Sequence, residues 1–280
     1  MILECGTRSL NLETPQVMGI LNVTPDSFSD GGRFNNLDQA LYHAEKMLAQ
    51  GAAIIDIGGE STRPGAKPIT LEQELERVIP VIEAIASRLD VLISVDTSSA
   101  QVITSAAIAG AHIINDVRSL TREGALAAAA AIHLPICLMH MNGEPQQMQN
   151  NPHYSLPIEQ AVLQQLTASV ERCQRAGIER KRLIIDPGFG FGKNNQHDFR
   201  LLNRLESLQD LKLPILTGLS RKRMIGSATG QVNAADRVSG SVGAAVICAL
   251  KGARIIRVHD VKATVEAMQV VSATFREDNV

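Results

Sequence analysis

The sequence predicts a single-domain α/β protein whose strands close into a (β/α)8 TIM barrel, and three observations support this prediction. Short apolar runs without polar alternation recur along the chain, which is typical of parallel strands buried on both faces. Segments with helical periodicity separate these runs, and no long linker interrupts the alternation. Hydrophobic residues make up 45% of the chain but aromatic residues only 3%, which suits a barrel core of Val, Ile, Leu and Ala. A doubly wound open sheet is the alternative, but it rarely needs eight strand–helix units.

The predicted strands are eight short apolar runs. In chain order they are VMGILNV (17–23), IIDIGG (54–59), VLISVDT (91–97), HIINDV (112–117), PICLMH (135–140), LIIDPG (183–188), PILTGLS (214–220) and IIRVH (255–259). Residues 1–16 precede the first strand, and we expect this N-terminal segment to cover the barrel floor. No low-complexity tract or linker divides the chain, so we expect one domain over residues 1–280.

The segments between the strands carry helix signals. The first, residues 35–51, has Asn36 as its expected N-cap and closes on Gly51. Thr70 and Gln73 form a capping-box pattern at the start of the second helix, and we expect Pro80 to kink or divide it. The remaining helical segments are TSSAQVITSAAIAG, an Ala-rich stretch after Gly124, SLPIEQAVLQQLTASVERCQRAG, HDFRLLNRLESLQD, NAADRVSGSVGAAVICALKG and DVKATVEAMQVVSATF.

Charge and composition restrict the classes of function. The net charge is −2, so no overall positive field attracts nucleic acid or an anionic membrane. The most apolar window, residues 124–139, is too short to span a bilayer, and Glu4 and Arg8 interrupt any export signal. The cysteines lack CxxC spacing, which predicts reduced thiols and no zinc site: Cys5, Cys137, Cys173 and Cys248. We therefore expect a soluble cytoplasmic protein.

Polar residues gather at the C-terminal ends of the predicted strands, where the active sites of this fold lie. Asp96, Asn115 and Asp186 end strands three, four and six, and would meet at one mouth of the barrel. Buried carboxylates are costly unless a ligand or partner satisfies them. This set, in which Asn115 can both donate and accept, suits a flat heterocycle rich in N–H donors. We interpret the neighbouring Asp56 and Asp116 as structural residues.

Positive charge comes from the last two strands. The run SRKR (220–223) follows strand seven, and Arg257 and His259 alternate along strand eight. Residues two apart on a strand face the same side, so Arg257 and His259 can hold one oxyanion-bearing group. Phosphate sites of these barrels commonly form around strands seven and eight. The sequence therefore indicates a site for a phosphorylated heterocycle.

Three loops could cover this site. TPDSFSDGG (24–32) follows Asn22, and GGESTRPGA (58–66) follows strand two. DPGFGFGKN (186–194) follows strand six and sets two phenylalanines among glycines, where an aromatic ligand would explain them. None of these loops has the spacing of a P-loop or a GxGxxG motif. An aromatic acid is the second ligand that they favour.

These stretches together resemble the dihydropteroate synthase family of bacterial folate synthesis. The matching stretches are GILNVTPDSFSDGG, DIGGESTRPGA, SVDTS, HIINDVRSL, LMHM, DPGFGFGKN, the SRK run and RVHDV. The resemblance extends from the first strand to the last. It implies a transferase that joins 6-hydroxymethyl-7,8-dihydropterin diphosphate to p-aminobenzoate, releasing pyrophosphate and 7,8-dihydropteroate, and that binds sulfonamides in the aminobenzoate pocket.

The resemblance also implies roles for individual residues in binding the pterin diphosphate. Asp96, Asn115 and Asp186 would hold the N–H groups of the pterin, Met139 would pack on its ring, and Lys222 would donate to it. The diphosphate would lie against a second set: Asn22, Thr62, Arg257 and His259. Asn22 would also help to hold a Mg²⁺ cofactor. The catalytic residues would be Asn22, Lys222, Arg257 and His259.

For p-aminobenzoate the resemblance implies a pocket made by the second, sixth and seventh loops: Thr62, Arg63, Pro64, Phe191, Lys222 and Arg223. Some members of the family have a serine where this chain has Arg223. An arginine there could pair with the carboxylate of aminobenzoate or point to solvent. The family resemblance also implies a homodimer.

Two other functions are compatible with a pterin-binding barrel. A corrinoid methyltransferase shares the Asp/Asn cradle for pterin, but it has no use for the cationic set of Lys222, Arg257 and His259. A catalytically inactive pterin-binding module is the second alternative. Binding of pterin diphosphate without turnover on addition of aminobenzoate would identify it.

Overall fold

The computed structural model describes residues 1–24, 33–61, 68–143, 148–149 and 151–276. Within these residues, eight parallel strands close into a barrel in the order β10-β3-β4-β5-β6-β7-β8-β9. The strands are β3 (Gln16–Asn22), β4 (Ile54–Gly58), β5 (Leu92–Asp96), β6 (Ile113–Asp116), β7 (Ile136–Met139), β8 (Leu183–Asp186), β9 (Ile215–Thr217) and β10 (Ala253–Val258). The (β/α)8 prediction is confirmed, and every predicted strand overlaps an observed one.

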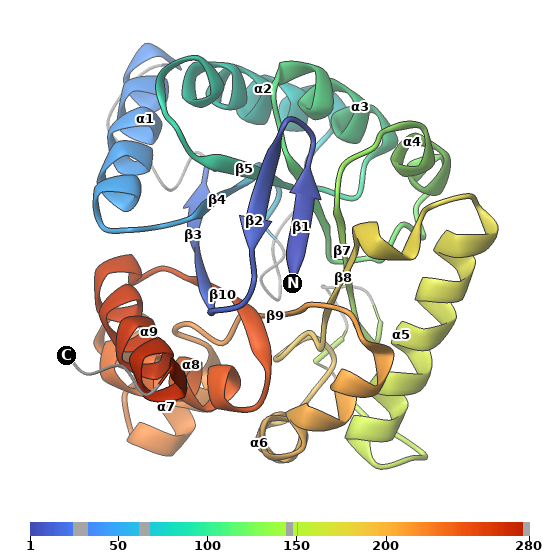
Figure 1. The fold of residues 1–280 in the computed structure, drawn as a ribbon, viewed down its shortest axis with the longest axis vertical. Coiled ribbons are helices and arrows are strands. Elements are labelled where there is room, and N and C mark those ends of the chain that lie inside the picture. The colour runs from blue at the N-terminus through green and yellow to red at the C-terminus, as the bar shows by residue number, and fades with distance from the viewer. Residues whose placement is uncertain (25–32, 62–67, 144–147, 150, 277–280) are drawn as a thin grey trace.

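Helices form a ring around these strands (Figure 1). They are α1 (Arg33–Ala49), α2 (Leu71–Arg88), α3 (Ala100–Ala109), α4 (Ala125–Ala131), α5 (Ile158–Arg175), α6 (Asn195–Asn203), α7 (Arg223–Thr229), α8 (Val238–Leu250) and α9 (Val261–Arg276). Short 3₁₀ turns span Arg180–Arg182, Leu205–Leu211 and Ala234–Arg237. Among the described helices none is both long and apolar enough to cross a membrane.

The helix signals were partly right. Thr70 and Gln73 form the predicted capping box at the start of α2. Pro80 lies inside α2 without dividing it, because Val78, Ile82 and Ile85 remain packed in the core on both sides of the proline. The N-cap prediction at Asn36 is wrong, since α1 begins at Arg33.

The two faces of the barrel strands have different partners. Outward-facing residues such as Ile55, Ile57 and Ile93 pack with the helices in the larger core cluster. The inward-facing residues near the strand starts form a separate cluster: Met18, Ile54, Leu92, Ile113, Cys137, Ile184, Leu216 and Ile255. Strand alternation then places further side chains of the same strands inside the barrel, closer to its C-terminal mouth.

An N-terminal hairpin packs against this inner cluster. Strands β1 (Ile2–Cys5) and β2 (Arg8–Asn11) pair antiparallel, and the hairpin lies across the centre of the barrel in Figure 1. Leu3, Leu10 and Leu12 are buried against the first inward-facing residues of the barrel strands. The hairpin therefore keeps water from the apolar lower end of the barrel interior, opposite the polar mouth.

Candidate active site

Strand register places several predicted site residues at the C-terminal ends of neighbouring strands. Asn22 is the register partner of Gly58, Gly58 of Asp96, and Asp96 of Asn115. On the far side of the barrel, Met139 is the register partner of Asp186. Parallel pairing thus gathers five of the residues predicted to bind pterin diphosphate from strands that are distant in the sequence.

Arg257 lies at the centre of this arrangement. Its Nε donates to Asp56 Oδ2 at 2.6 Å, and its second terminal nitrogen donates to Asp96 Oδ2 at 3.0 Å. Burial opposes the charged guanidinium, but the carboxylates of Asp56 and Asp96 outweigh it and raise the pKa of Arg257 above its ordinary value. The guanidinium is thereby fixed as a permanent cation inside the barrel mouth.

Asp56, which we interpreted as a structural residue from the sequence, contacts two of the predicted site residues. Its side chain is fully buried, and Oδ2 also accepts from Asn115 Nδ2 at 3.2 Å. It therefore joins Arg257 and Asn115 through one oxygen, while Oδ1 is buried with no hydrogen-bond partner in the described structure. The available signal was its position in the apolar run IIDIGG, where an aspartate faces the barrel interior two residues after Ile54.

Asp96 has an unusual protonation equilibrium. Burial, together with the neighbouring Asp56, raises the pKa of its carboxyl to about 7 against the opposing effect of Arg257. A carboxyl with this pKa can change charge near neutral pH. Such groups are typical of ligand-binding and catalytic sites.

Asp186 and Lys222 form the other side of the mouth. Asp186 Oδ1 accepts from the Gly188 N–H at 2.7 Å, and burial raises its pKa although Lys222 opposes the shift. Burial lowers the pKa of Lys222 to about 8, again against the effect of Asp186. The Lys222 ammonium donates to the Phe189 carbonyl and lies 4.6 Å from the centre of the Phe191 ring. The structure thus brings together Lys222 and Phe191, two residues expected in the aminobenzoate pocket.

His259 is oriented by a serine that was not singled out as a site residue. Its backbone N–H donates to Ser220 Oγ at 3.1 Å, and its Nδ1 lies 3.0 Å from the same oxygen. A cavity of about 650 Å³ opens beside Asn22 and His259 and is also bordered by Lys46 and Lys262. This side of the mouth therefore offers cationic and amide groups to an anion.

Arg223 lies near the segment before α5 as well as at the mouth-side end of the seventh loop. It is exposed at the start of α7 and donates to Gln149 Oε1 at 3.3 Å. Phe191 is half-buried and faces Lys222, whereas Phe189 is fully buried in the core. Thr62, Arg63, Pro64 and most of the loop 24–32 lie outside the described residues.

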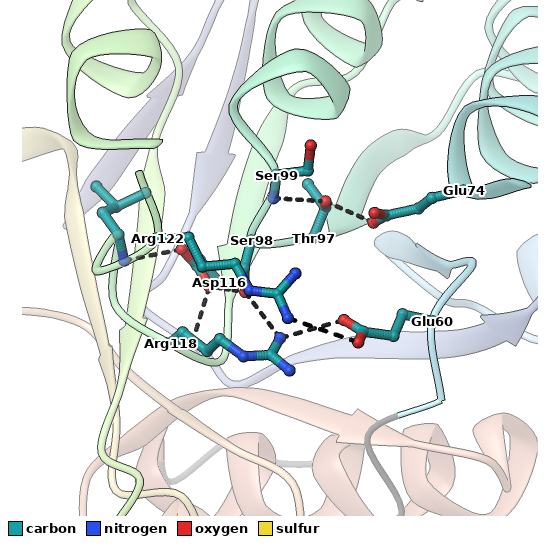
Figure 2. A network of polar contacts seen from close by, with 9 residues as sticks. Glu60, Glu74, Thr97, Ser98, Ser99, Asp116, Arg118 and Arg122 are labelled. Atoms are coloured by element: carbon teal, nitrogen blue, oxygen red, sulfur yellow. Dashed lines mark hydrogen bonds and ion pairs between the residues drawn. The ribbon is translucent and has the colours of Figure 1, made fainter. Parts of the chain in front are cut away.

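A separate polar network supports the ends of β4, β5 and β6 (Figure 2). Arg118 donates to Glu60 at 3.1 Å with both side chains largely buried, and Arg122 lies 3.9 Å from the other Glu60 oxygen. Glu74 accepts from the Thr97 hydroxyl at 2.6 Å, and burial raises the pKa of its carboxyl. The network thus connects the segments that directly follow β4, β5 and β6.

Asp116 belongs to this network (Figure 2). Its carboxylate accepts from the N–H groups of Arg118 and Leu120, both at 2.8 Å, and from the Ser98 hydroxyl. Ser119 and Leu120 have left-handed backbone conformations, with φ of 53° and 59°, which non-glycine residues rarely adopt. Asp116 stabilises this turn, in agreement with the structural role expected for it.

Comparisons with known proteins agree with this geometry. Residues 18–259 match the family described as pterin binding enzyme. The dihydropteroate synthase of Escherichia coli strain K12 is 57% identical over 266 residues, covering 95% of this chain and 94% of that protein.

Solved structures give the same result. The Yersinia pestis dihydropteroate synthase with a sulfonamide drug superposes with a TM-score of 0.94 at 56% identity, over 99% of this chain and 100% of that one. The Xanthomonas albilineans enzyme in complex with 7,8-dihydropteroate superposes with a TM-score of 0.90 at 44% identity, over 98% and 99% of the two chains.

A closed parallel barrel with buried carboxylates and cations at its C-terminal mouth defines an enzyme of the pterin-binding class. Within that class, the chain belongs to the dihydropteroate synthase family. The resemblance noted from the sequence motifs is confirmed.

Proposed function

We propose that this enzyme condenses 6-hydroxymethyl-7,8-dihydropterin diphosphate with p-aminobenzoate to give 7,8-dihydropteroate and pyrophosphate. The principal support is the cluster of Arg257, Asp56 and Asp96 at the barrel mouth, facing Asp186 and Lys222. This arrangement offers acceptors for the N–H groups of a pterin and cations for its carbonyl and diphosphate. The relatives reported above are named dihydropteroate synthases, which agrees with this reaction.

The carboxylates and Asn115 bind the pterin ring in this proposal. Asp96 and Asp186 accept from its N–H groups, while Lys222 donates to its carbonyl oxygen. Met139, buried beside Asp186, packs on the ring. Asp56 holds Arg257 and Asn115 so that both face the same ligand.

The bond that breaks is the C–O bond between the pterin methylene and the diphosphate. Its electron pair leaves with the diphosphate, and the dihydropterin ring delocalises the positive charge on the methylene. The lone pair of the aryl amine then forms the C–N bond, and the amine loses a proton to solvent or phosphate. Arg257 and His259 stabilise the negative charge of the leaving group, so the contribution of the protein is mainly electrostatic.

Asn22 is the residue that would hold Mg²⁺. Among the described residues no group of three or more His, Cys, Asp or Glu could hold a metal ion. A magnesium site of one amide oxygen, substrate phosphates and waters still fits, because Mg²⁺ keeps several waters and prefers oxygen ligands. When bound, the ion would neutralise charge on the departing diphosphate.

Release of pyrophosphate tests the proposed activity. Purified protein is incubated with dihydropterin diphosphate and Mg²⁺, with and without p-aminobenzoate. We expect pyrophosphate release that depends on aminobenzoate and matches dihydropteroate formation mole for mole. Tight pterin binding without such release would leave the inactive binding module as the function. Methyl transfer to a corrinoid would identify the methyltransferase alternative.

The active form in this proposal is a cytoplasmic homodimer. Helix α8 is rich in small residues and exposes Ile247 and Leu250, and α9 exposes Val270 and Phe275. All four cysteines lie in the described residues and are free and buried, which suits a reducing compartment. Light scattering after size-exclusion chromatography tests the dimer, and a Leu250→Glu variant that stays dimeric would exclude α8 from the interface.

A further inference from the structure

Lys193 is a fully buried lysine at the end of the loop that follows β8. Its ammonium contacts the Gly188 carbonyl at 2.7 Å, the Phe191 carbonyl at 3.2 Å and His140 Nδ1 at 2.8 Å. Lysine is rarely buried without a specific partner, because its desolvation is costly. The residue therefore has a role inside the protein, and none of the binding roles proposed above accounts for it.

The contacts of Lys193 match the donors of an ammonium group. Burial, together with the charge of Lys193, lowers the pKa of His140 to about 2, so the imidazole is neutral and can accept through Nδ1. An ammonium then has three N–H donors for three acceptors. Burial lowers the pKa of Lys193 itself to about 7, while Asp198 and Asp186 favour its charged form.

The loop of residues 187–193 has carbonyls that accept from its own Lys193 and from side chains of other segments. Lys193 donates to the carbonyls of Gly188 and Phe191, and Lys222 donates to the carbonyl of Phe189. Two further carbonyls of the loop, those of Gly190 and Gly192, accept from the Gln149 side chain and from the Tyr154 hydroxyl. Lys193 is thus one of two cations around which this loop folds.

Glycines permit this conformation. Gly188, Gly190 and Gly192 have positive φ values of 64°, 78° and 65°. A Cβ at Gly188 would lie 1.9 Å from the His140 carbonyl oxygen, and one at Gly192 would lie 2.3 Å from that of Asn142. The loop is therefore pressed against the segment after β7, and Lys193 fills the space between the two.

The same loop carries groups of the active site. Its Gly188 N–H holds Asp186, its Phe189 carbonyl holds Lys222, and its Phe191 ring lies against Lys222. The Phe191 carbonyl has Lys193 as its side-chain donor in the described structure. Loss of this contact would free the half of the loop that carries the Phe191 ring.

We propose that Lys193 is a positioning residue, which fixes the loop 187–193 so that Phe191 and Lys222 shape the aminobenzoate pocket. This inference rests on the proposed function for the identity of the second substrate. Gly188 has two further hydrogen bonds. Its N–H donates to Asp186 Oδ1, and its carbonyl accepts from the Phe191 N–H at 3.1 Å. The Asp186 side of the loop is therefore less dependent on Lys193 than the Phe191 side.

The test compares Lys193→Met with wild type and with Lys181→Met, a control at a lysine that is 72% exposed. Methionine keeps the length of the side chain but donates no hydrogen bond. We expect the KM for aminobenzoate to rise about tenfold and the KM for pterin diphosphate to rise less than about threefold. Equal rises in both, or a fall in kcat alone with lower thermal stability, would overturn the positioning role.

A second readout needs no turnover. Amide hydrogen exchange of residues 188–192 in ligand-free protein should be about tenfold faster in Lys193→Met than in Lys181→Met. If Lys193→Met does not fold, Lys193→Gln, which keeps two N–H donors, is expected to show a smaller shift in the same direction. Unchanged exchange would refute the inference even in an active enzyme. Inactive wild type with faster exchange in the variant would instead refute only the proposed function.

Discussion

The carboxylates of the barrel mouth differ in what they do for Arg257. Asp56 is fully buried and contacts both Arg257 and Asn115, whereas Asp96 is partly exposed and, within the described part of the chain, accepts from the Arg257 side chain. A buried carboxylate that holds two ligand-binding side chains affects substrate binding through them. Substitution of Asp56 should therefore alter the positions of both the Arg257 and the Asn115 side chains.

The substitution Asp56→Asn tests this role. It keeps the shape of the side chain but removes the charge that holds Arg257, so we expect kcat/KM for pterin diphosphate to fall about 100-fold. Glu159→Gln is the matched control, since Glu159 is 13% exposed and pairs with Arg200 at 2.8 Å, between α5 and α6 and outside the cluster. An Asp56→Asn enzyme with less than about a threefold loss would show that Arg257 needs no such support.

The pH dependence of kcat/KM for pterin diphosphate follows from two groups, Asp96 and Lys222. Asp96 must be ionised to accept from the pterin, and burial raises its pKa to about 7, so activity should rise as pH increases through 7. Lys222 must be protonated to donate, and burial lowers its pKa to about 8, so activity should fall above pH 8. Lys222→Arg should move the falling limb upward by more than one pH unit, because arginine stays charged. If the falling limb of Lys222→Arg lies at the same pH as that of wild type, the limb belongs to a group other than Lys222.

At the scale of elements, the glycines of the loop 187–193 allow a direct comparison. Gly188 and Gly230 have similar positive φ values, 64° and 72°, but a Cβ meets the His140 backbone only at Gly188 and has open space at Gly230. Gly230→Ala should therefore cost about 1–2 kcal/mol of stability from backbone strain. Gly188→Ala should cost clearly more and lower kcat/KM as well, as measured by urea unfolding and steady-state kinetics. Equal costs would mean that the loop adjusts freely.

The N-terminal hairpin should contribute stability but not activity. Leu3→Ala removes a side chain that is 2% exposed and packed in the inner cluster, so we expect a loss of about 2–5 kcal/mol in the free energy of unfolding. Ile2→Ala, at a side chain that is 64% exposed, is the control and should change stability by less than about 0.5 kcal/mol. kcat at a temperature where both variants are folded should match wild type. A lower kcat for Leu3→Ala would couple the hairpin to the site.

The strands could be predicted from the sequence because burial on both faces leaves a continuous apolar run. The start of α1 could not, since an asparagine favours an N-cap but its neighbours can extend the helix past it, as happens at Asn36. The contacts of Asp56 could not be predicted, because its partners, Asn115 and Arg257, are 59 and 201 residues away in the chain. The burial of Lys193 could not be predicted for a different reason, since two of its three partners are close in the sequence. A lysine is expected in solvent until a folded loop surrounds it.

At the scale of the whole molecule, the charge distribution agrees with a small anionic substrate. The net charge is only −2, while Lys222, Arg257 and His259 gather on the last two strand–loop units. A local cationic cluster binds a diphosphate without a general attraction for polyanions. The barrel supplies the rigid frame, because parallel pairing fixes the register of every strand that contributes a side chain.

The most direct test of the account follows the atoms through the reaction. Dihydropterin diphosphate labelled with ¹⁸O at the oxygen between methylene and phosphorus is incubated with ¹⁵N-aminobenzoate and Mg²⁺, and the products are analysed by mass spectrometry. Attack on the methylene carbon predicts that all ¹⁸O leaves in pyrophosphate and that the dihydropteroate carries ¹⁵N. Label retained in a hydroxymethyl pterin, with no ¹⁵N-labelled dihydropteroate, would contradict the alkyl transfer that we assign to this site.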